Sequence, residues 1–240
     1  RGSIYRIRKE RKLIMFAIIK KEVKSYFLSP IGYVFIGLFL FMASIFFYLD
    51  VIYYGSTNFE YMFYSLSTIL TFITPILTMR MFAEEKKEGT DQLLFTSPVS
   101  ISNIVFGKFL SAVIILVITE LFTFLYYGIL LCFGAPHLPT ALVTLLGFLL
   151  LGTAYISFGM FASSLTENQI IAGITTIAFF ILTWFMPQFS EGLEAFSLMT
   201  IFNTFPSGQL AINEIVTFLS FTLLFILLTI IVLQRKKSVK

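Results

Sequence analysis

Few residues in this chain could do chemistry, and their spacing does not form a catalytic or metal site. His137 is the only histidine and Cys132 the only cysteine, so neither a histidine pair nor a thiolate cluster can bind a metal ion. No H-E-x-x-H segment and no G-x-x-x-x-G-K-[ST] segment occurs, which counts against zinc-dependent hydrolysis and nucleotide-phosphate binding. We therefore expect no enzyme activity, no metal and no cofactor on this chain.

The composition shows what must position the remaining polar groups. Of the 240 residues, 58% are apolar, 18% aromatic and only 12% charged, whereas soluble domains carry about 25% charged residues. The mean hydropathy is +0.91, so there are too few polar side chains to cover a globule of this size. This predicts an all-α integral membrane protein, and it excludes a soluble nucleic-acid-binding protein despite the net charge of +4.

Charge-free windows locate the membrane spans, because a helix needs about 20 apolar residues to cross the hydrocarbon core. A seventh window at 195–213 contains Asn203, Pro206 and Gly208, and we interpret 188–213 as an outer segment of short helices or a shallow re-entrant segment. The sequence thus predicts six transmembrane helices at about 31–49, 61–79, 104–132, 141–163, 168–187 and 215–233.

The basic residues indicate the orientation of these spans. All 17 Lys and Arg residues lie in three segments, 1–24, 80–108 and 235–240. Six crossings place all three segments on one side, and the positive-inside rule makes that side cytoplasmic. Both termini are therefore expected in the cytoplasm, and a seventh crossing is disfavoured because it would move 235–240 outside.

The N-terminal region precedes the first span. Residues 1–14 form a basic tail that is either native or foreign, and Met15 is a plausible natural start. In 15–28, Phe16, Ile19, Val23 and Tyr26 recur at helical spacing, which predicts an amphipathic interfacial helix. We interpret 15–240 as a single membrane domain.

The loop at 81–103 is the only long cytoplasmic connection that we expect. Gly89 is placed to stop the helix that continues the second span, and Thr90 can cap a new short helix, which Pro98 ends. Ser100 can then cap the third span, which leaves Lys108 at the lipid boundary. The short helix would present the apolar triplet 93–95, which favours burial in the headgroup region or in a groove of another protein.

The residues of this loop carry a family resemblance. The segments AEEKKEGTDQLL at 83–94 and SPVS at 97–100, followed by Gly107 and Lys108, resemble type-2 ATP-binding-cassette (ABC) permeases. FLSPIGY at 27–33, FASSLTENQ at 161–169 and the second span with Pro75 are similar to the gliding-motility and copper-enzyme-maturation branch of that family.

The resemblance implies a permease subunit, most simply an exporter, in the prokaryotic cytoplasmic (inner) membrane. Its partners would be a dimer of cytoplasmic ABC ATPases that binds ATP and Mg, and a second permease copy in a homodimer or heterodimer. By position, the ATPase contact (the coupling helix) would comprise Glu88, Gly89, Thr90, Asp91, Leu93, Leu94 and Phe95.

Four further residues are candidates for the transport step. Pro75 interrupts the second span and could act as a hinge. The resemblance places Thr175 and Thr176 near the path between two permease copies. Glu120 is the one acid well inside a span, so it could contact a substrate, make a structural hydrogen bond, or lie near the outer headgroups.

Two other functions stay open at this stage. A self-contained channel or secondary transporter would work without an ATPase, with Glu120 as its main functional residue. A membrane scaffold would use the loop only to recruit a soluble partner.

Overall fold

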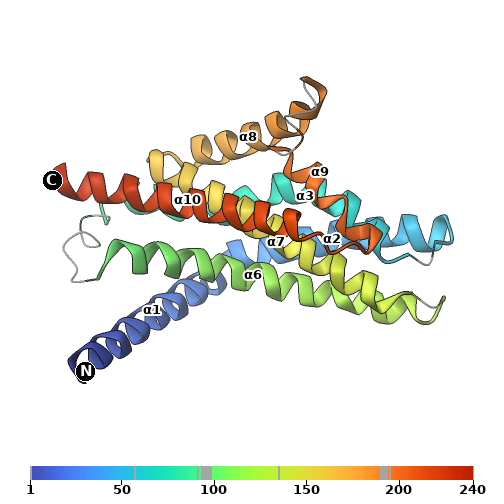
Figure 1. The fold of residues 1–240 in the computed structure, drawn as a ribbon, viewed down its shortest axis with the longest axis horizontal. Coiled ribbons are helices and arrows are strands. Elements are labelled where there is room, and N and C mark those ends of the chain that lie inside the picture. Colours follow the sequence, from blue (N-terminus) through green and yellow to red (C-terminus); the bar gives the residue numbers. More distant parts are fainter. Residues whose placement is uncertain are drawn as a thin grey trace.

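The computed structural model describes residues 2–56, 58–90, 92, 99–134, 136–189, 194 and 196–239, and for residues 2–14, 238 and 239 only the backbone. This part of the chain consists of helices and connecting turns (Figure 1). The elements are, in order, α1 (Gly2–Leu28), α2 (Pro30–Phe47), η1 (Tyr48–Tyr53), α3 (Glu60–Thr78), α4 (Ala83–Lys87), α6 (Ile101–Leu130), α7 (Leu138–Leu165), α8 (Gln169–Phe189), α9 (Leu198–Phe202), η3 (Phe205–Ser207) and α10 (Ile212–Val239).

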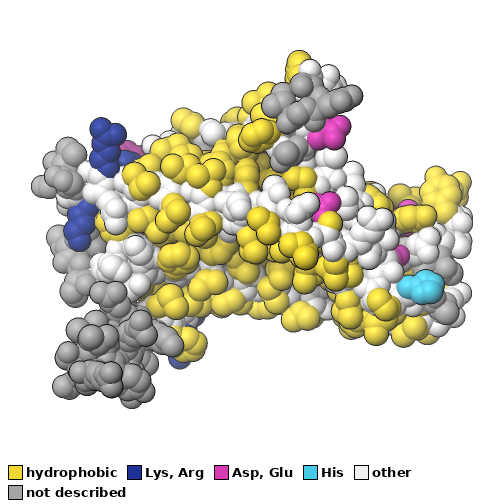
Figure 2. Space-filling view, viewed as in Figure 1, with side chains coloured by type: hydrophobic (Ala, Val, Ile, Leu, Met, Phe, Trp, Pro, Cys, Tyr) yellow, Lys and Arg dark blue, Asp and Glu magenta, His cyan; other side chains and the backbone are white. Residues whose placement is uncertain are grey.

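Six helices are long and apolar enough to cross a membrane, which confirms the predicted fold class. They are formed by α2 with η1, by α3 with α4, and by α6, α7, α8 and α10. Large apolar side chains remain exposed along their length (Figure 2), as expected for surfaces that face lipid. Both the number and the character of the predicted spans are therefore present.

Helix α7 is the centre of the bundle and packs against α3, α6, α8 and α10. Its close contacts depend on glycines, because a Cβ at Gly152 would lie 2.4 Å from the Leu116 side chain, and one at Gly159 would lie 2.2 Å from Thr78 Oγ1. Small residues let helices approach closely in lipid, where packing replaces the hydrophobic driving force. The helices α3, α6 and α7 form the buried core, and α2, α8 and α10 are the more exposed spans.

The basic parts of the chain lie at one end of the bundle, and acidic side chains are also visible toward the other (Figure 2). Figure 1 places both termini at this end, together with α4 and the start of α6. The Lys and Arg side chains visible in Figure 2 gather there as well, and the histidine lies toward the opposite end. We refer to these two ends as the basic end and the far end.

The N-terminal helix is longer than expected. α1 runs without interruption from Gly2 to Leu28, so the helix does not break at Met15. The residues of α1 that contact other helices include Ile18, Glu22 and Tyr26, spaced four apart on one face, and Phe27, whose ring lies 5.6 Å from that of Tyr33 in α2. Phe16, which we expected on the apolar face, is 67% exposed.

The outer segment folds back onto the bundle through short helices. α9 and η3 bury Phe202 and Phe205 completely, and the Phe205 ring lies where a Cβ at Gly147 of α7 would stand. Gly208, with φ +79°, ends η3 in the left-handed region that favours glycine. The described part of this segment thus contains short helices, α9 and η3.

Candidate functional site

The site lies at the basic end, where the chain leaves α3 and enters the loop at 81–103, which we call the coupling loop. The turn between α3 and α4 is held by one side chain of α7. Ser163 Oγ accepts hydrogen bonds from the backbone N–H groups of Phe82 and Ala83, each at 3.0 Å, and donates to the carbonyl of Met79 at 3.0 Å. Because one hydroxyl satisfies three backbone groups of the turn, Ser163 fixes the direction of α4 relative to α3.

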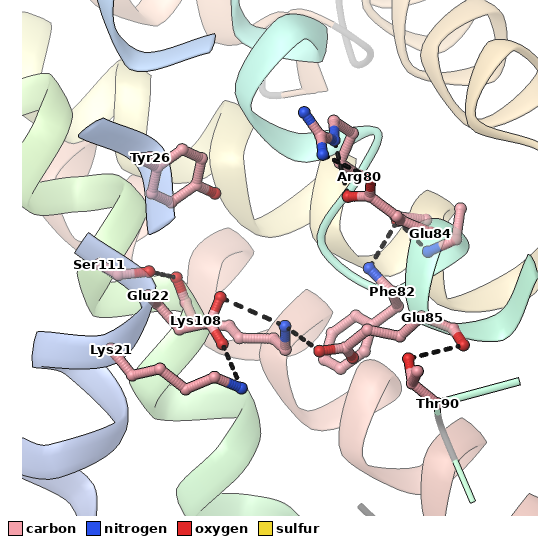
Figure 3. Close-up of polar contacts among 12 residues, drawn as sticks. Lys21, Glu22, Tyr26, Arg80, Phe82, Glu84, Glu85, Thr90, Lys108 and Ser111 are labelled. Carbon is pink, nitrogen blue, oxygen red and sulfur yellow. Dashed lines mark hydrogen bonds and ion pairs between the residues drawn. The ribbon is translucent and has the colours of Figure 1, made fainter. Parts of the chain in front are cut away.

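A buried lysine joins three helices beside this turn. Lys108 of α6 places its Nζ 2.7 Å from Glu85 Oε1 of α4 and 3.4 Å from Glu22 Oε2 of α1 (Figure 3). Its side chain is only 4% exposed, and the ammonium lies 5.4 Å from the centre of the Phe82 ring. We call Glu22, Phe82, Glu85 and Lys108 the Lys108 cluster. Since a buried charge requires counter-charges, this cluster fixes the relative positions of its helices.

Two further contacts attach α1 and α4 to the same region. Tyr26 Oη of α1 donates to the carbonyl of Leu77 at 3.1 Å. Burial raises the pKa of Tyr26 well above its ordinary value, and Glu22 raises it further while Arg80 opposes both, so the phenol keeps its proton for this bond. Arg80 pairs with Glu84 on the next turn, with Arg80 Nε 2.7 Å from Glu84 Oε2.

Basic side chains also meet the C-terminal end of α7. The carbonyl of Ser164 accepts from Lys86 of α4 and, at 3.3 Å, from Lys236 of α10. Cations are favoured at this end of a helix, where carbonyl groups lack helical partners. The ends of α4, α7 and α10 are therefore held together at the basic end.

A polar cavity of about 630 Å³ borders the cluster. Its walls come from α1, from the end of α3 with α4, and from α6, and they include Tyr26, Arg80, Glu85, Glu88 and Thr90. The cavity therefore extends from the C-terminal half of α1 to the residues at which the loop leaves α4.

The structure describes only part of the expected ATPase contact. Glu88 ends α4, Gly89 has φ +69° as its role as a helix stop requires, and Thr90 Oγ1 donates to the carbonyl of Glu85 at 3.2 Å. All three are exposed. The other proposed contact residues lie outside the described residues, namely Asp91, Leu93, Leu94 and Phe95.

The second end of the loop behaves as expected in one respect and differs in another. Ser100 caps α6 by accepting from the N–H of Asn103 at 3.4 Å. The Lys108 side chain, however, is enclosed by protein, at 4% exposure, because it pairs with Glu22 and Glu85. The pairing could not be foreseen from the chain, because 86 residues separate Glu22 from Lys108.

Glu120 lies buried within α6, far along the helix from the Lys108 cluster. The neighbouring hydroxyls bond to main-chain carbonyls: Thr119 Oγ1 donates to Ile115 at 2.7 Å and Thr123 Oγ1 to Glu120 at 2.6 Å. Glu120 Oε1 has no hydrogen-bond partner among the described residues. The local side-chain hydrogen bond, one of the three interpretations, is thus not formed by either threonine.

The two path candidates on α8 lie on different faces. Thr176 is buried and donates to the carbonyl of Ala172 at 2.8 Å, whereas Thr175 is exposed. Pro75 lies inside α3, one turn before its end, and faces α8: a Cβ at Gly173 would stand 3.8 Å from Pro75 Cβ. The structure therefore brings the hinge candidate close to α8 and keeps Thr175 on the outer surface.

The sequence analysis did not predict the contacts that Ser163, Glu22 and Lys108 make. Lys108 was expected only as a charge at the lipid boundary. The available signal for Lys108 was its place as the fifth residue of the predicted span 104–132, where an ionised group requires a partner.

Together the six apolar helices and the basic end define a polytopic membrane protein in which the loop 81–103 connects two core spans. Comparison with protein families shows that residues 14–239 match the ABC-2 family transporter protein family, and the chain belongs to that family. It is accordingly a membrane permease subunit of an ABC transporter, a component that works with an ABC ATPase. Comparison with curated proteins gives no match.

Proposed function

We propose that this chain is the permease of an exporter, with its basic end in the cytoplasm of a prokaryotic cell and its far end outside the cytoplasmic membrane. The observation that carries the proposal is the family match over 14–239, combined with basic residues gathered at one end. The segments 27–33 and 161–169 favour the gliding-motility and copper-enzyme-maturation branch. ATP and Mg would be bound by the partner ATPase.

The coupling segment, residues 88–95, docks into a cleft of the ATPase. Its start is supported by a rigid base: Ser163 fixes the turn before α4, and Lys108 fixes α4 against α6. Glu88 and Thr90 line the polar cavity together with residues of α1. The ATPase can therefore contact this base from the side of α1. A rigid base transmits a push from the ATPase to the spans instead of absorbing it.

Transport then follows from alternating access between two permease copies, as a homodimer or a heterodimer. Closure of two ATPases on ATP displaces two coupling segments, and α3 and α6 tilt with them. α2 and α8 are the least buried spans of this chain, so they have apolar surface available for the second copy. Thr175 lies on that exposed surface of α8.

Copurification of the chain with its ABC ATPase tests this function. We expect the two proteins to elute together in a one-to-one ratio from detergent or nanodiscs, and ATP turnover to depend on the permease. Ion or proton flux in liposomes that hold the permease alone would contradict the proposal and support a self-contained channel or secondary transporter. Binding of a soluble partner that does not hydrolyse ATP would support the scaffold.

The native cysteine offers a test of orientation. Cys132 is exposed and follows the end of α6 at the far end. We expect a membrane-impermeant maleimide to label it in intact spheroplasts. The matched control is Lys87→Cys in a Cys132→Ser background, at an exposed position of α4, which should be labelled only after the membrane is opened. The reverse pattern would overturn the assigned orientation.

A further inference from the structure

The proposed mechanism gives α1 no part beyond anchoring, yet α1 is attached to both ends of the coupling loop. The chain enters the loop just after Glu85 and comes back to the same place at Lys108. These two side chains meet at 2.7 Å. Glu22 of α1 reaches the same ammonium at 3.4 Å. One buried cation therefore contacts α1, the outgoing end of the loop and the returning end.

The packing around this cation leaves little room for α1 to move independently. Gly107, next to Lys108, is so close to α1 that a Cβ there would lie 2.6 Å from Ile18 Cγ2. One turn further along α1 from Glu22, Tyr26 bonds to the end of α3. The contacts at Ile18, Glu22 and Tyr26 lie on one face of α1 and join it to α6 and α3, and Lys108 connects it in turn to Glu85 of α4.

We propose that Lys108 is a positioning residue that locks α1 to the base of the coupling segment, so that α1 moves with α4 and α6 when the ATPase pulls. The proposal rests on the function proposed above. It makes α1 part of the unit that moves with the ATPase.

Removal of the Lys108 charge would turn the attraction between α1 and α4 at this place into repulsion. Glu22 and Glu85 would then face each other with only the exposed Lys21, 3.9 Å from Glu22 Oε1, as a nearby counter-charge in the described part of the chain, and the two like charges repel. Glu85 Oε2 already lacks a hydrogen-bond partner among the described residues, so no other donor stands ready to replace the ammonium. α1 would separate from α4, and the coupling segment would move without carrying α1.

The experiment uses the complete permease–ATPase complex in nanodiscs, in a Cys132→Ser background. Nitroxide labels at Lys20→Cys on α1 and Lys87→Cys on α4, both exposed positions, report the distance between the two helices. The distance is measured without nucleotide and after trapping with ATP and vanadate. The variants are Lys108→Met and Lys108→Arg, and Lys24→Met on the exposed side of α1 is the matched control.

With Lys108 present, we expect one narrow distance that nucleotide does not change. In Lys108→Met it should broaden and shift on trapping, and the kcat of ATP hydrolysis should change several-fold while the KM for ATP stays the same, because the nucleotide site is on the partner. Lys108→Arg should restore most of the wild-type behaviour, and Lys24→Met should match the wild type.

A narrow, nucleotide-independent distance in Lys108→Met would overturn the proposal. If that variant does not accumulate, Glu22→Gln replaces it: this change removes only the α1 contact and leaves the pair of Lys108 with Glu85, so the same broadening is expected and its absence again overturns the lock. If no ATPase binds even the unsubstituted chain, the proposed function fails, while the nucleotide-free distance of the permease alone still tests the lock.

Discussion

Replacement of Leu93, Leu94 and Phe95 by glutamate is expected to abolish copurification of the ATPase. Three consecutive large apolar side chains on a cytoplasmic loop are suited to fill a groove of a partner, and such anchors each contribute about 2 kcal/mol or more. A loss of 2 kcal/mol weakens binding about 30-fold. A complex that has lost even two anchors is therefore too weak to survive purification. The measurement is the ATPase-to-permease ratio after affinity purification and gel filtration.

The matched control for this variant is Leu210→Glu, an exposed apolar residue in the outer segment. It adds the same type of charge at the far end and should leave the ATPase ratio unchanged. If the triple variant keeps a full complement of ATPase, the docking surface lies elsewhere. If Leu210→Glu also loses the ATPase, the effect comes from general damage to the fold.

Ser163→Ala is expected to destabilise the permease by about 2 to 4 kcal/mol, since each buried polar group left without a partner costs about 1 to 3 kcal/mol. The change removes the acceptor for the N–H groups of Phe82 and Ala83 and the donor to Met79. Reversible SDS unfolding followed by circular dichroism gives the free energy of unfolding. Because the same turn orients α4, the ATPase activity of the complex should also fall.

Ser157→Ala is the matched control for the serine on α7. Ser157 is equally buried, but its hydroxyl donates only to the carbonyl of Ala154 in its own helix, at 2.7 Å. Its removal should cost well under 1 kcal/mol, because that carbonyl keeps its helical bond. Equal losses in the two variants would show that Ser163 does not fix the turn.

The local signals in the coupling loop were predicted well. Gly89 adopts the left-handed backbone expected of a helix stop, and Ser100 caps α6 as its position indicated. Both follow from interactions within a few residues, so the sequence contains all the necessary information. The docking surface at 93–95 lies outside the described residues and stays a prediction.

The length and continuity of α1 were not predicted from its composition. The segment 2–14 is basic and was interpreted as a tail, yet the helix continues through it because no proline or internal glycine interrupts it. Of the expected face, Tyr26 contacts α3, and Ile19 and Val23 are half-buried, whereas Phe16 is exposed. Ile18 and Glu22 add contacts with α6 that the apolar spacing did not indicate.

By itself the sequence determined the class of protein, the six apolar spans, the three segments that hold the basic residues and the position of the long loop in the chain. These features follow from the free-energy cost of placing charges or unpaired backbone groups in hydrocarbon. Each short segment carries this cost by itself, whatever its tertiary contacts. Only the tertiary structure decided that Lys108 joins α1 to both ends of the loop and that Ser163 holds the turn before α4. Such contacts join residues about 80 positions apart, and their partners are selected by helix packing, which no local pattern records.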